Sequence, residues 1–400
     1  MKVKLYKSKL NGTINVPSSK SYSHRYLIAA MLAKNSSEVS NLYFSSDVKA
    51  TLSCMSSFGC EYEVKDNSVV IFNNNNYIDN PVFECNESGS TLRFLIPIAL
   101  SKYESVTFKG SEKLIERGIQ VYENILSKQN IEVVKNKDSI VIKGKLKSGV
   151  FDVDGFSSSQ YITGLLFTLP LLDGDSVINI IPPFNSRNYV DMTLKVLEDY
   201  NIKCVRKGLT ITIKGNQQYV AKDFEVEGDY SNAAFYDAFN YLDNNVTLKG
   251  LNDDSLQGDK VYKQYFEKLN NSNVTLDVSN AIDLAPVLMA LAAIKHGCTL
   301  NNTSRLKIKE SNRAEAMQQE LAKVGVSVDI FDNFLIVHKC EIKEPTESFD
   351  SHNDHRIAMA MSMFAALFDI SINNALAINK SYPTFYEDFV KLGGKMDYEV

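Results

Sequence analysis

The feature that most constrains the fold of this chain is an internal repeat. Six times, a small polar cluster is followed by an apolar stretch with helical character and then by a short segment of alternating polar and apolar residues. Successive clusters lie about 70 residues apart, with one shorter interval of about 52 residues between the fourth and the fifth. This spacing indicates repeated structural units. The clusters begin near Ser19, Ser88, Ser158, Asp229, Ala281 and Asn353.

The second part of each repeat also follows one plan. An amphipathic helical pattern is followed by two short alternating segments with turn residues between them, as in YVDMTLKVLEDYNIKCVRKGLTITIKG. Each repeat is therefore predicted to form a helix, a strand, a second helix and a hairpin. The fourth repeat is compressed. The sixth stops after FYEDFVKLGGK, so it is expected to lack its closing strands.

The first helix of each repeat is apolar on nearly all of its faces, as in LRFLIPIAL and APVLMALAAI. Such a helix must be surrounded by protein. Three of these helices, enclosed by sheets, would form one hydrophobic core. Six repeats therefore predict an α/β (α+β) protein with two pseudo-threefold domains of about 200 residues each.

The expected boundary between the domains lies between the third and fourth repeats, close to Asp229. One domain would span residues 18–228. The other would span residues 1–17 and 229–400, because the opening strand VKLYKSKLNGTINV is left over and can complete the truncated sixth repeat. The chain would then cross twice between the domains, which predicts a hinge.

Composition excludes several classes of function. The net charge of −5 at pH 7 gives no reason to expect binding to nucleic acid or to a membrane surface. The six cysteines lack CxxC spacing and histidine neighbours, so we expect reduced, mostly buried thiols and no metal site. The N-terminus has no apolar signal core, and the apolar runs end well short of the roughly 20 residues of a membrane span. These features predict a soluble, monomeric, cytoplasmic protein without a metal or organic cofactor.

Hydroxyls and cations gather where the apolar helices begin. A helix start offers free backbone N–H groups to an anion, and hydroxyls or a glycine let a phosphate approach closely. In SSKSYSHR, this places Lys20, Ser21 and Arg25 at or just inside one helix start, although a capping serine with solvated charges explains that segment equally well. The segment SGSTLR, in which Gly89 allows close approach of the backbone, is on its own explained by a helix cap. Capping accounts for one serine of SSSQ, but hardly for three.

Two further clusters carry charge in the second half of the chain. Lys309 and Arg313 are four residues apart, so they are expected on one helical face with Glu310 beside them, or alternatively in surface ion pairs. Arg356 opens an almost wholly apolar helix and needs an anionic partner there. Asp283 either caps the helix that begins at Pro286 or is kept for proton transfer, and both interpretations stay open.

Together, the cations come from both expected domains of a net acidic chain. This arrangement predicts an interdomain cleft for a strongly anionic small substrate, because a cleft concentrates the field of its own charges. Asp283 and Glu310 would be the only proton-transfer groups near it. The cations are Lys20, Arg25, Lys309, Arg313, Arg356 and Lys380.

The same segments carry a family resemblance across nearly the whole chain. It resembles the EPSP synthase (3-phosphoshikimate 1-carboxyvinyltransferase) family, whose members have six βαβαββ repeats in two domains that enclose buried helices, an inside-out α/β barrel, and close on their substrates. In order, the matching segments are SSKSYSHR, ESGSTLRF, SSSQYITG, SRNYVDMTL, AIDLAP, KIKESNRAEAM, NDHRIAMA and INKSYPTF.

The resemblance implies transfer of the enolpyruvyl group of phosphoenolpyruvate to the 5-hydroxyl of shikimate 3-phosphate in the shikimate pathway, through a tetrahedral intermediate. It implies Asp283 as the base for the hydroxyl, Glu310 as the acid/base at the methylene carbon, and Lys20 as a third catalytic group. The residues implied for shikimate 3-phosphate are Lys20, Ser21, Arg25, Ser158, Ser159, Ser186, Asp283 and Lys309. Those implied for phosphoenolpyruvate are Lys20, Gly89, Lys113, Gln160, Arg313, Arg356 and Lys380.

Two residues depart from the family pattern. Lys113 stands where the family usually has an arginine that contacts the phosphate of phosphoenolpyruvate. The point charge of an ammonium group therefore replaces the paired N–H donors of a guanidinium. Glu87 stands where many members have asparagine, and it adds negative charge near the expected anion pocket. We therefore expect an altered affinity for phosphoenolpyruvate and an altered sensitivity to glyphosate, which inhibits the family at that site.

Two alternatives remain to be weighed. UDP-N-acetylglucosamine 1-carboxyvinyltransferase shares the fold and the donor, but that family commonly has a catalytic cysteine on the loop matching residues 111–116, and this loop has none. A non-catalytic ring such as a DNA sliding clamp is also acidic and pseudo-sixfold. Clamps carry their cations on exposed helices, however, whereas the cations here lie at the starts of apolar helices.

Overall fold

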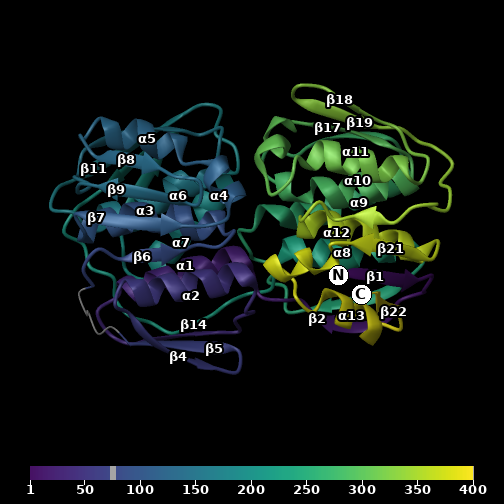
Figure 1. The fold of residues 1–400 in the computed structure, drawn as a ribbon, viewed down its shortest axis with the longest axis horizontal. Helices are drawn as coiled ribbons and strands as arrows, with labels where there is room; N and C mark the ends of the chain where they lie inside the picture. Colours follow the sequence, from purple (N-terminus) through teal and green to yellow (C-terminus); the bar gives the residue numbers. More distant parts are fainter. Residues whose placement is uncertain (73–77, 400) are drawn as a thin grey trace. The chain divides into compact units, whose positions relative to one another are not determined.

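The computed structural model describes residues 1–72 and 78–399. They form two compact units, an N-terminal unit (Ser18–Glu227) and a C-terminal unit (Met1–Pro17 with Gly228–Val400). Each unit is a set of small sheets around apolar helices (Figure 1). The predicted fold class, α/β with buried helices enclosed by sheets, is confirmed.

The N-terminal unit contains three sheets of four strands with one shared topology. In each sheet the first strand pairs in parallel with the second, and the remaining pairs are antiparallel. In sheet order, the strands are β14 (Phe224–Glu225), β3 (Ser37–Ser40), β5 (Ser68–Phe72) and β4 (Glu61–Lys65); β6 (Val82–Glu84), β7 (Ser105–Lys109), β9 (Ser139–Lys143) and β8 (Glu132–Lys135); and β10 (Val150–Asp154), β11 (Ser176–Ile181), β13 (Thr210–Ile213) and β12 (Cys204–Lys207).

The helices of this unit follow the predicted division into two kinds. Buried helices open the repeats, and in Figure 1 they lie among the strands: α1 (Lys20–Leu32), α3 (Gly89–Lys102) and α6 (Ser159–Thr168), the last continued by η1 (Leu169–Leu171). Most of their apolar side chains are buried whichever face they lie on, and Leu95 and Ile96 of α3 are fully buried. The more amphipathic helices are α2 (Ser46–Ser57), α4 (Glu112–Arg117), α5 (Gln120–Ser127) and α7 (Arg187–Asp199).

The C-terminal unit contains two four-stranded sheets and one two-stranded sheet among its described residues. In sheet order, the strands are β20 (Phe349–Asp350), β21 (Ile370–Asn373), β1 (Lys2–Tyr6) and β22 (Lys395–Glu399); β16 (Val274–Asp277), β17 (Cys298–Asn301), β19 (Phe334–Val337) and β18 (Val328–Ile330); and β15 (Asn245–Lys249) with β2 (Asn11–Asn15). The helices are α8 (Tyr230–Asn240), α9 (Tyr262–Asn271), α10 (Ala285–Ile294), α11 (Arg313–Ala322), α12 (His355–Ser362) and α13 (Phe385–Lys391), with η2 (Gly258–Val261), η3 (Ile282–Leu284), η4 (Ser304–Ile308), η5 (Met363–Ala366) and η6 (Ala375–Lys380).

The opening segment joins two different sheets of the C-terminal unit. β1 lies between β21 and β22 and is antiparallel to both, with Val3 opposite Ile372 and Tyr398. β2 pairs in parallel with β15 of the fourth repeat. The expectation of one opening strand was therefore wrong, because the segment forms two strands, β1 and β2, that belong to different sheets. The sixth repeat also continues beyond FYEDFVKLGGK into β22.

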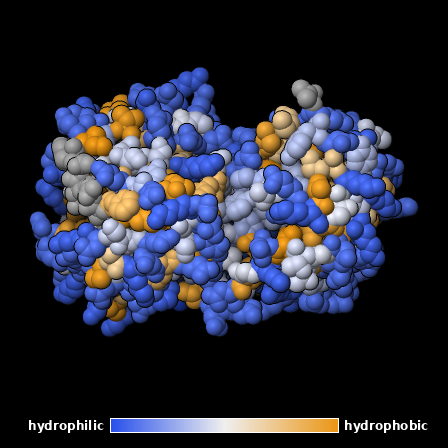
Figure 2. Space-filling model, turned by 90° about the horizontal axis from the view of Figure 1, so that it is seen from below, coloured by the Kyte–Doolittle hydropathy of each residue, from blue (hydrophilic) through white to orange (hydrophobic). Residues whose placement is uncertain are grey.

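All six cysteines lie in the part of the chain that the structure describes. The six cysteines are free thiols, four of them buried. In the part of the chain that the structure describes, no group of three or more His, Cys, Asp or Glu side chains is placed to hold a metal ion. Over that same part, none of the helices combines the length and the apolar character needed to cross a membrane. Hydrophilic residues cover most of the face in Figure 2, and hydrophobic ones form small separate patches.

Candidate active site

Each buried helix of the N-terminal unit begins with a serine cap. The hydroxyls of Ser19, Ser88 and Ser158 accept hydrogen bonds from the backbone N–H groups of Tyr22, Thr91 and Gln160, at 3.4, 3.2 and 3.2 Å. Capping thus explains one serine in each cluster. The other residues of these clusters need a different explanation.

Arg25 is buried inside the N-terminal unit among neutral acceptors. Its Nε donates to Thr193 Oγ1 at 2.9 Å, and its Nη atoms donate to the carbonyl oxygens of Ser21 at 2.7 Å and Tyr189 at 3.0 Å. Burial lowers the pKa of this guanidinium to about 10. Among the contacts described for Arg25 there is no carboxylate, so a bound anion would balance a charge that burial makes costly.

Lys20 differs from Arg25 because it has an acidic partner. Its Nζ lies 2.9 Å from Oδ2 of Asp47, and both side chains are largely buried. Asp47 lies in the first turn of α2, where the helix dipole favours a carboxylate. The sequence analysis missed Asp47, which occupies an ordinary helix-start position.

Gln160, implied for phosphoenolpyruvate, is held between two side chains of α3. Its Oε1 accepts from Arg93 Nη1 at 2.8 Å, and its Nε2 donates to Ser90 Oγ at 3.0 Å. Arg93 also donates to the hydroxyl of Tyr161 at 3.2 Å and to the carbonyl oxygen of Gly118 at 3.0 Å. Arg93 is therefore a buried cation that orients Gln160, although the sequence analysis treated its segment only as a cap.

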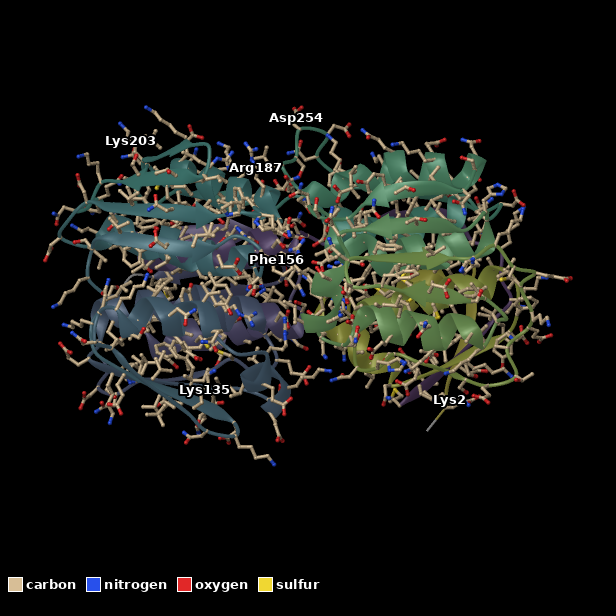
Figure 3. The ribbon with its side chains drawn as sticks, turned by 90° about the horizontal axis from the view of Figure 1, so that it is seen from above. Lys2, Lys135, Phe156, Arg187, Lys203 and Asp254 are labelled. Atoms are coloured by element: carbon tan, nitrogen blue, oxygen red, sulfur yellow. The ribbon has the colours of Figure 1, made fainter. Side chains whose placement is uncertain are left out.

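The other predicted residues of this unit lie at helix starts or on a helix surface. Ser159 is the buried first residue of α6. Ser186 is buried just before α7 with a φ of 53°, and its neighbour Arg187 is 57% exposed (Figure 3). Lys113 is exposed on α4. Glu87 lines a surface pocket together with Glu84, Lys109 and Asp138.

The candidate site residues of the C-terminal unit are grouped around Arg313, whose side chain is 1% exposed. Its Nε donates to Asp354 Oδ2 at 2.7 Å, its Nη1 to Asp283 Oδ1 at 2.7 Å, and its Nη2 to Glu310 Oε2 at 2.6 Å. One guanidinium therefore orients three carboxylates from three segments of the chain. Asp283 and Glu310 are the two groups predicted for proton transfer.

Asp283 is surrounded by cations. Its carboxylate lies 3.3 Å from Lys309 Nζ and 3.6 Å from Arg356 Nη2. Burial alone would raise the pKa of this carboxyl, but Lys309, Arg356 and Arg313 together hold it well below its usual range. Asp283 is thus ionised throughout the neutral range.

Two expectations about this cluster need correction. Asp283 does not cap α10, whose start at Leu284 and Ala285 has no side-chain cap. Lys309 and Arg313 do not share a helical face: Lys309 is an extended residue after η4, and α11 begins only at Arg313. The intervening Ser311 and Asn312 interrupt the helix, yet both cations still reach Asp283.

Arg356 lies at the start of α12 as predicted. Its anionic partner is Asp283, which comes from a distant segment of the chain. Besides Asp283, its guanidinium contacts the hydroxyl of Ser231. The sequence analysis missed Asp259, a buried carboxyl in η2 whose charge acts on Arg356 and Asp283. Burial, followed by the charge of Asp283, raises the pKa of Asp259 to about 6. The last predicted cation, Lys380, donates to the carbonyl oxygen of Asn353 at 2.5 Å.

The raised pKa of Asp259 makes the stability of the protein pH-dependent. Protonation favours the folded state, so this contribution is fully present below about pH 4 and is lost as the pH rises through about 6. Asp259→Asn resembles the protonated acid. We expect the variant to melt several degrees above the wild type at pH 7.5, and close to it at pH 4.5, by calorimetry. Asp254→Asn, on an exposed side chain labelled in Figure 3, is the control. An equal difference at both pH values would contradict this.

Comparison with known proteins gives a consistent result. Residues 6–389 match the family model described as EPSP synthase (3-phosphoshikimate 1-carboxyvinyltransferase). The proteins named 3-phosphoshikimate 1-carboxyvinyltransferase from Clostridium novyi and Clostridium kluyveri are 40% and 41% identical to this chain, with 99% of this chain and 98% of each relative covered. An EPSP synthase structure from Acinetobacter baumannii matches the fold with a TM-score of 0.81 at 19% identity, over the full length of both chains. The chain therefore belongs to the EPSP synthase family.

Proposed function

We propose that this protein transfers the enolpyruvyl group of phosphoenolpyruvate to the 5-hydroxyl of shikimate 3-phosphate and releases inorganic phosphate. The observation that carries this function, beyond family membership, is the pair of carboxylates that share Arg313. The reaction needs one group to take the proton of an alcohol and another to add a proton to a carbon and later remove it. Asp283 and Glu310 are such a pair.

The proposed reaction has two steps. In the first, Asp283 accepts the proton of the 5-hydroxyl, whose oxygen bonds to C2 of phosphoenolpyruvate, while Glu310 gives a proton to C3. In the second, C3 returns a proton to Glu310, the double bond re-forms, the C2–O bond to phosphate breaks, and the proton held by Asp283 leaves with the phosphate. Lys20 is proposed to stabilise the departing phosphate. The cations around Asp283 keep it ionised, and it becomes a stronger base when Arg313 or Arg356 turns to the donor carboxylate instead.

Substrate binding is proposed to use residues of both units. The buried Arg25, with Lys20, Ser21, Ser158, Ser159 and Ser186, would hold shikimate 3-phosphate together with Asp283 and Lys309. Gly89, Lys113, Gln160, Lys20 and Lys380 would hold the phosphate of phosphoenolpyruvate. Arg313 and Arg356 would hold its carboxylate, which then replaces Asp283 or Glu310 on one Nη of Arg313. Such an exchange frees a base at the moment the donor binds.

The decisive experiment is a phosphate-release assay. We expect release when phosphoenolpyruvate and shikimate 3-phosphate are both present, and none with either alone. No release is expected when UDP-N-acetylglucosamine replaces shikimate 3-phosphate. Release only with the sugar nucleotide would favour the related enolpyruvyltransferase, and salt-dependent DNA binding without phosphate release would favour a clamp.

Lys113 provides a separate test of the donor site. An arginine offers two parallel N–H donors to a phosphate, whereas a lysine offers a point charge. We expect Lys113→Arg to lower the KM for phosphoenolpyruvate about threefold or more and to change the inhibition constant of glyphosate, with the KM for shikimate 3-phosphate unchanged. The three constants can be measured in the same phosphate-release assay. If neither the donor KM nor the inhibition constant changes, Lys113 has no role in this site.

Three further properties stay predictions. These are the location of the active site in a cleft that closes on the substrates, the monomeric state, and the cytoplasmic location.

A further inference from the structure

A short turn, residues 351–354, connects β20 to α12 and contacts two cations of the candidate site. The carboxylate of Asp354 accepts a hydrogen bond from Arg313 Nε at 2.7 Å, and the carbonyl oxygen of Asn353 accepts one from Lys380 Nζ at 2.5 Å. The proposed function assigns Arg313 and Lys380 to phosphoenolpyruvate. The conformation of the 351–354 turn therefore decides where two donor-binding cations lie.

This turn has a backbone conformation that is unfavourable for the residues in it. His352 and Asn353 have φ angles of 51° and 54°, in the left-handed region that residues with a side chain adopt infrequently. Such a conformation persists where contacts with the surrounding structure hold it in place. The turn therefore needs partners outside itself.

Glu320, on α11, supplies these contacts, and its side chain is 2% exposed. Its Oε1 lies 2.8 Å from Nε2 of His352. Its Oε2 accepts hydrogen bonds from the backbone N–H of Asp350 at 2.8 Å and from Lys323 Nζ at 2.7 Å. Lys323 in turn donates to the carbonyl oxygen of Ser348 at 3.0 Å. One buried carboxylate thus joins α11 to the end of β20 and to the turn.

Glu320 and Arg313 hold the turn from the same side. They are seven residues apart on α11, so their side chains leave one face of the helix. Arg313 contacts Asp354 at the end of the turn, and Glu320 contacts His352 near its beginning. The proposed reaction uses Arg313 but gives Glu320 no role. A buried charged group that no part of the mechanism uses needs an explanation of its own.

We propose that Glu320 is a positioning residue for phosphoenolpyruvate binding, which acts by holding His352 in the left-handed 351–354 turn. The turn then presents the Asp354 carboxylate and the Asn353 carbonyl to the two donor-binding cations. This inference rests on the proposed function. Shikimate 3-phosphate is assigned to other residues, so the effect of Glu320 should fall on the donor.

The contact between Glu320 and His352 depends on pH. The hydrogen bond to Glu320 raises the pKa of His352 above its ordinary value, and the charges of Glu320 and Asp350 add to this rise, whereas burial and the charge of Lys323 oppose it. These groups face His352 from α11 and β20. Its protonated form therefore favours the folded turn. This contribution is complete below about pH 6.5 and is lost as the pH rises through the raised pKa.

The test compares variants by steady-state kinetics with both substrates. Glu320→Gln is expected to raise the KM for phosphoenolpyruvate about 10-fold, with the KM for shikimate 3-phosphate within about twofold of the wild type. His352→Leu should act in the same direction, and His352→Gln, which keeps an N–H donor, should recover part of the loss. The double variant Glu320→Gln/His352→Leu should match Glu320→Gln within about twofold, because both changes break one contact. Glu315→Gln, at an exposed glutamate of α11, is the control.

A pH profile separates positioning from a general loss of stability. The ratio of kcat/KM for phosphoenolpyruvate between the wild type and His352→Leu is expected to fall about threefold or more from about pH 6 to about pH 9, because a neutral imidazole binds Glu320 more weakly. If Glu320→Gln does not fold, this profile decides.

Three results would overturn the inference while leaving the proposed function intact. They are a donor KM of Glu320→Gln within twofold of the wild type, an equal rise in the KM of both substrates, and a kcat/KM ratio that does not change with pH. A wild type that releases no phosphate would overturn both the inference and the proposed function.

Discussion

Arg313→Gln is expected to lower kcat/KM by a factor of about 1,000 or more and to destabilise the C-terminal unit by about 3–5 kcal/mol. The guanidinium is 1% exposed and holds three carboxylates at 2.6–2.7 Å. Glutamine cannot supply the charge, so Asp283, Glu310 and Asp354 would repel one another in a buried space. Both predicted proton-transfer groups would lose their orientation at once. Urea unfolding and the phosphate-release assay measure the two effects.

Arg313→Lys and Lys263→Gln complete this experiment. Lysine keeps a positive charge but cannot reach three carboxylates in fixed directions, so we expect an intermediate loss of stability and a large loss of activity. Lys263 is 47% exposed and lies 4.0 Å from Asp253, a pair that contributes little. Its substitution should leave both quantities unchanged. An Arg313→Gln protein as stable and as active as the Lys263→Gln control would show that the three carboxylates do not depend on this cation.

The repeat itself could be predicted from the sequence because it depends on short-range patterns. Helices such as LRFLIPIAL are apolar on all faces wherever they occur, and their burial follows directly. The strand partners were harder to predict, because pairing between distant segments leaves no local signal. β14 pairs with β3 from 185 residues away, with Phe224 opposite Val39. The two strands within the opening segment escaped notice for the same reason.

Prediction of the candidate site was limited in the same way, because its contacts join distant segments of the chain. Lys309, Glu310 and Arg313 were identified correctly as a cluster, but the helical explanation for their proximity was wrong. Their common point is Asp283, which lies on η3 and is brought to them by the fold. The carboxylates that neutralise the cations were largely missed. Asp354 had a signal, since it lies in the NDHR segment, whereas Asp47 and Asp259 resemble ordinary helix-start residues.

Glu310→Gln is expected to lower kcat by a factor of about 1,000 and to change either KM by no more than about threefold. The amide oxygen of glutamine can still accept the hydrogen bond from Arg313 Nη2, which in the wild type spans 2.6 Å. The cluster should therefore keep its geometry while losing the group that gives a proton to C3 of phosphoenolpyruvate and takes it back. In deuterated water, deuterium uptake at C3 should fall together with kcat.

Glu315→Gln is the matched control, because Glu315 is an exposed glutamate in the first turn of α11, the helix that follows Glu310. It should keep the wild-type kcat and the wild-type deuterium uptake. The uptake is the sharper of the two readouts, since a variant that merely bound its substrates in a poorer geometry would lose turnover without a selective loss of exchange. Wild-type deuterium uptake in a Glu310→Gln enzyme with strongly reduced kcat would mean that another group protonates C3. Asp283, which shares Arg313 with Glu310, would then be the next carboxylate to test.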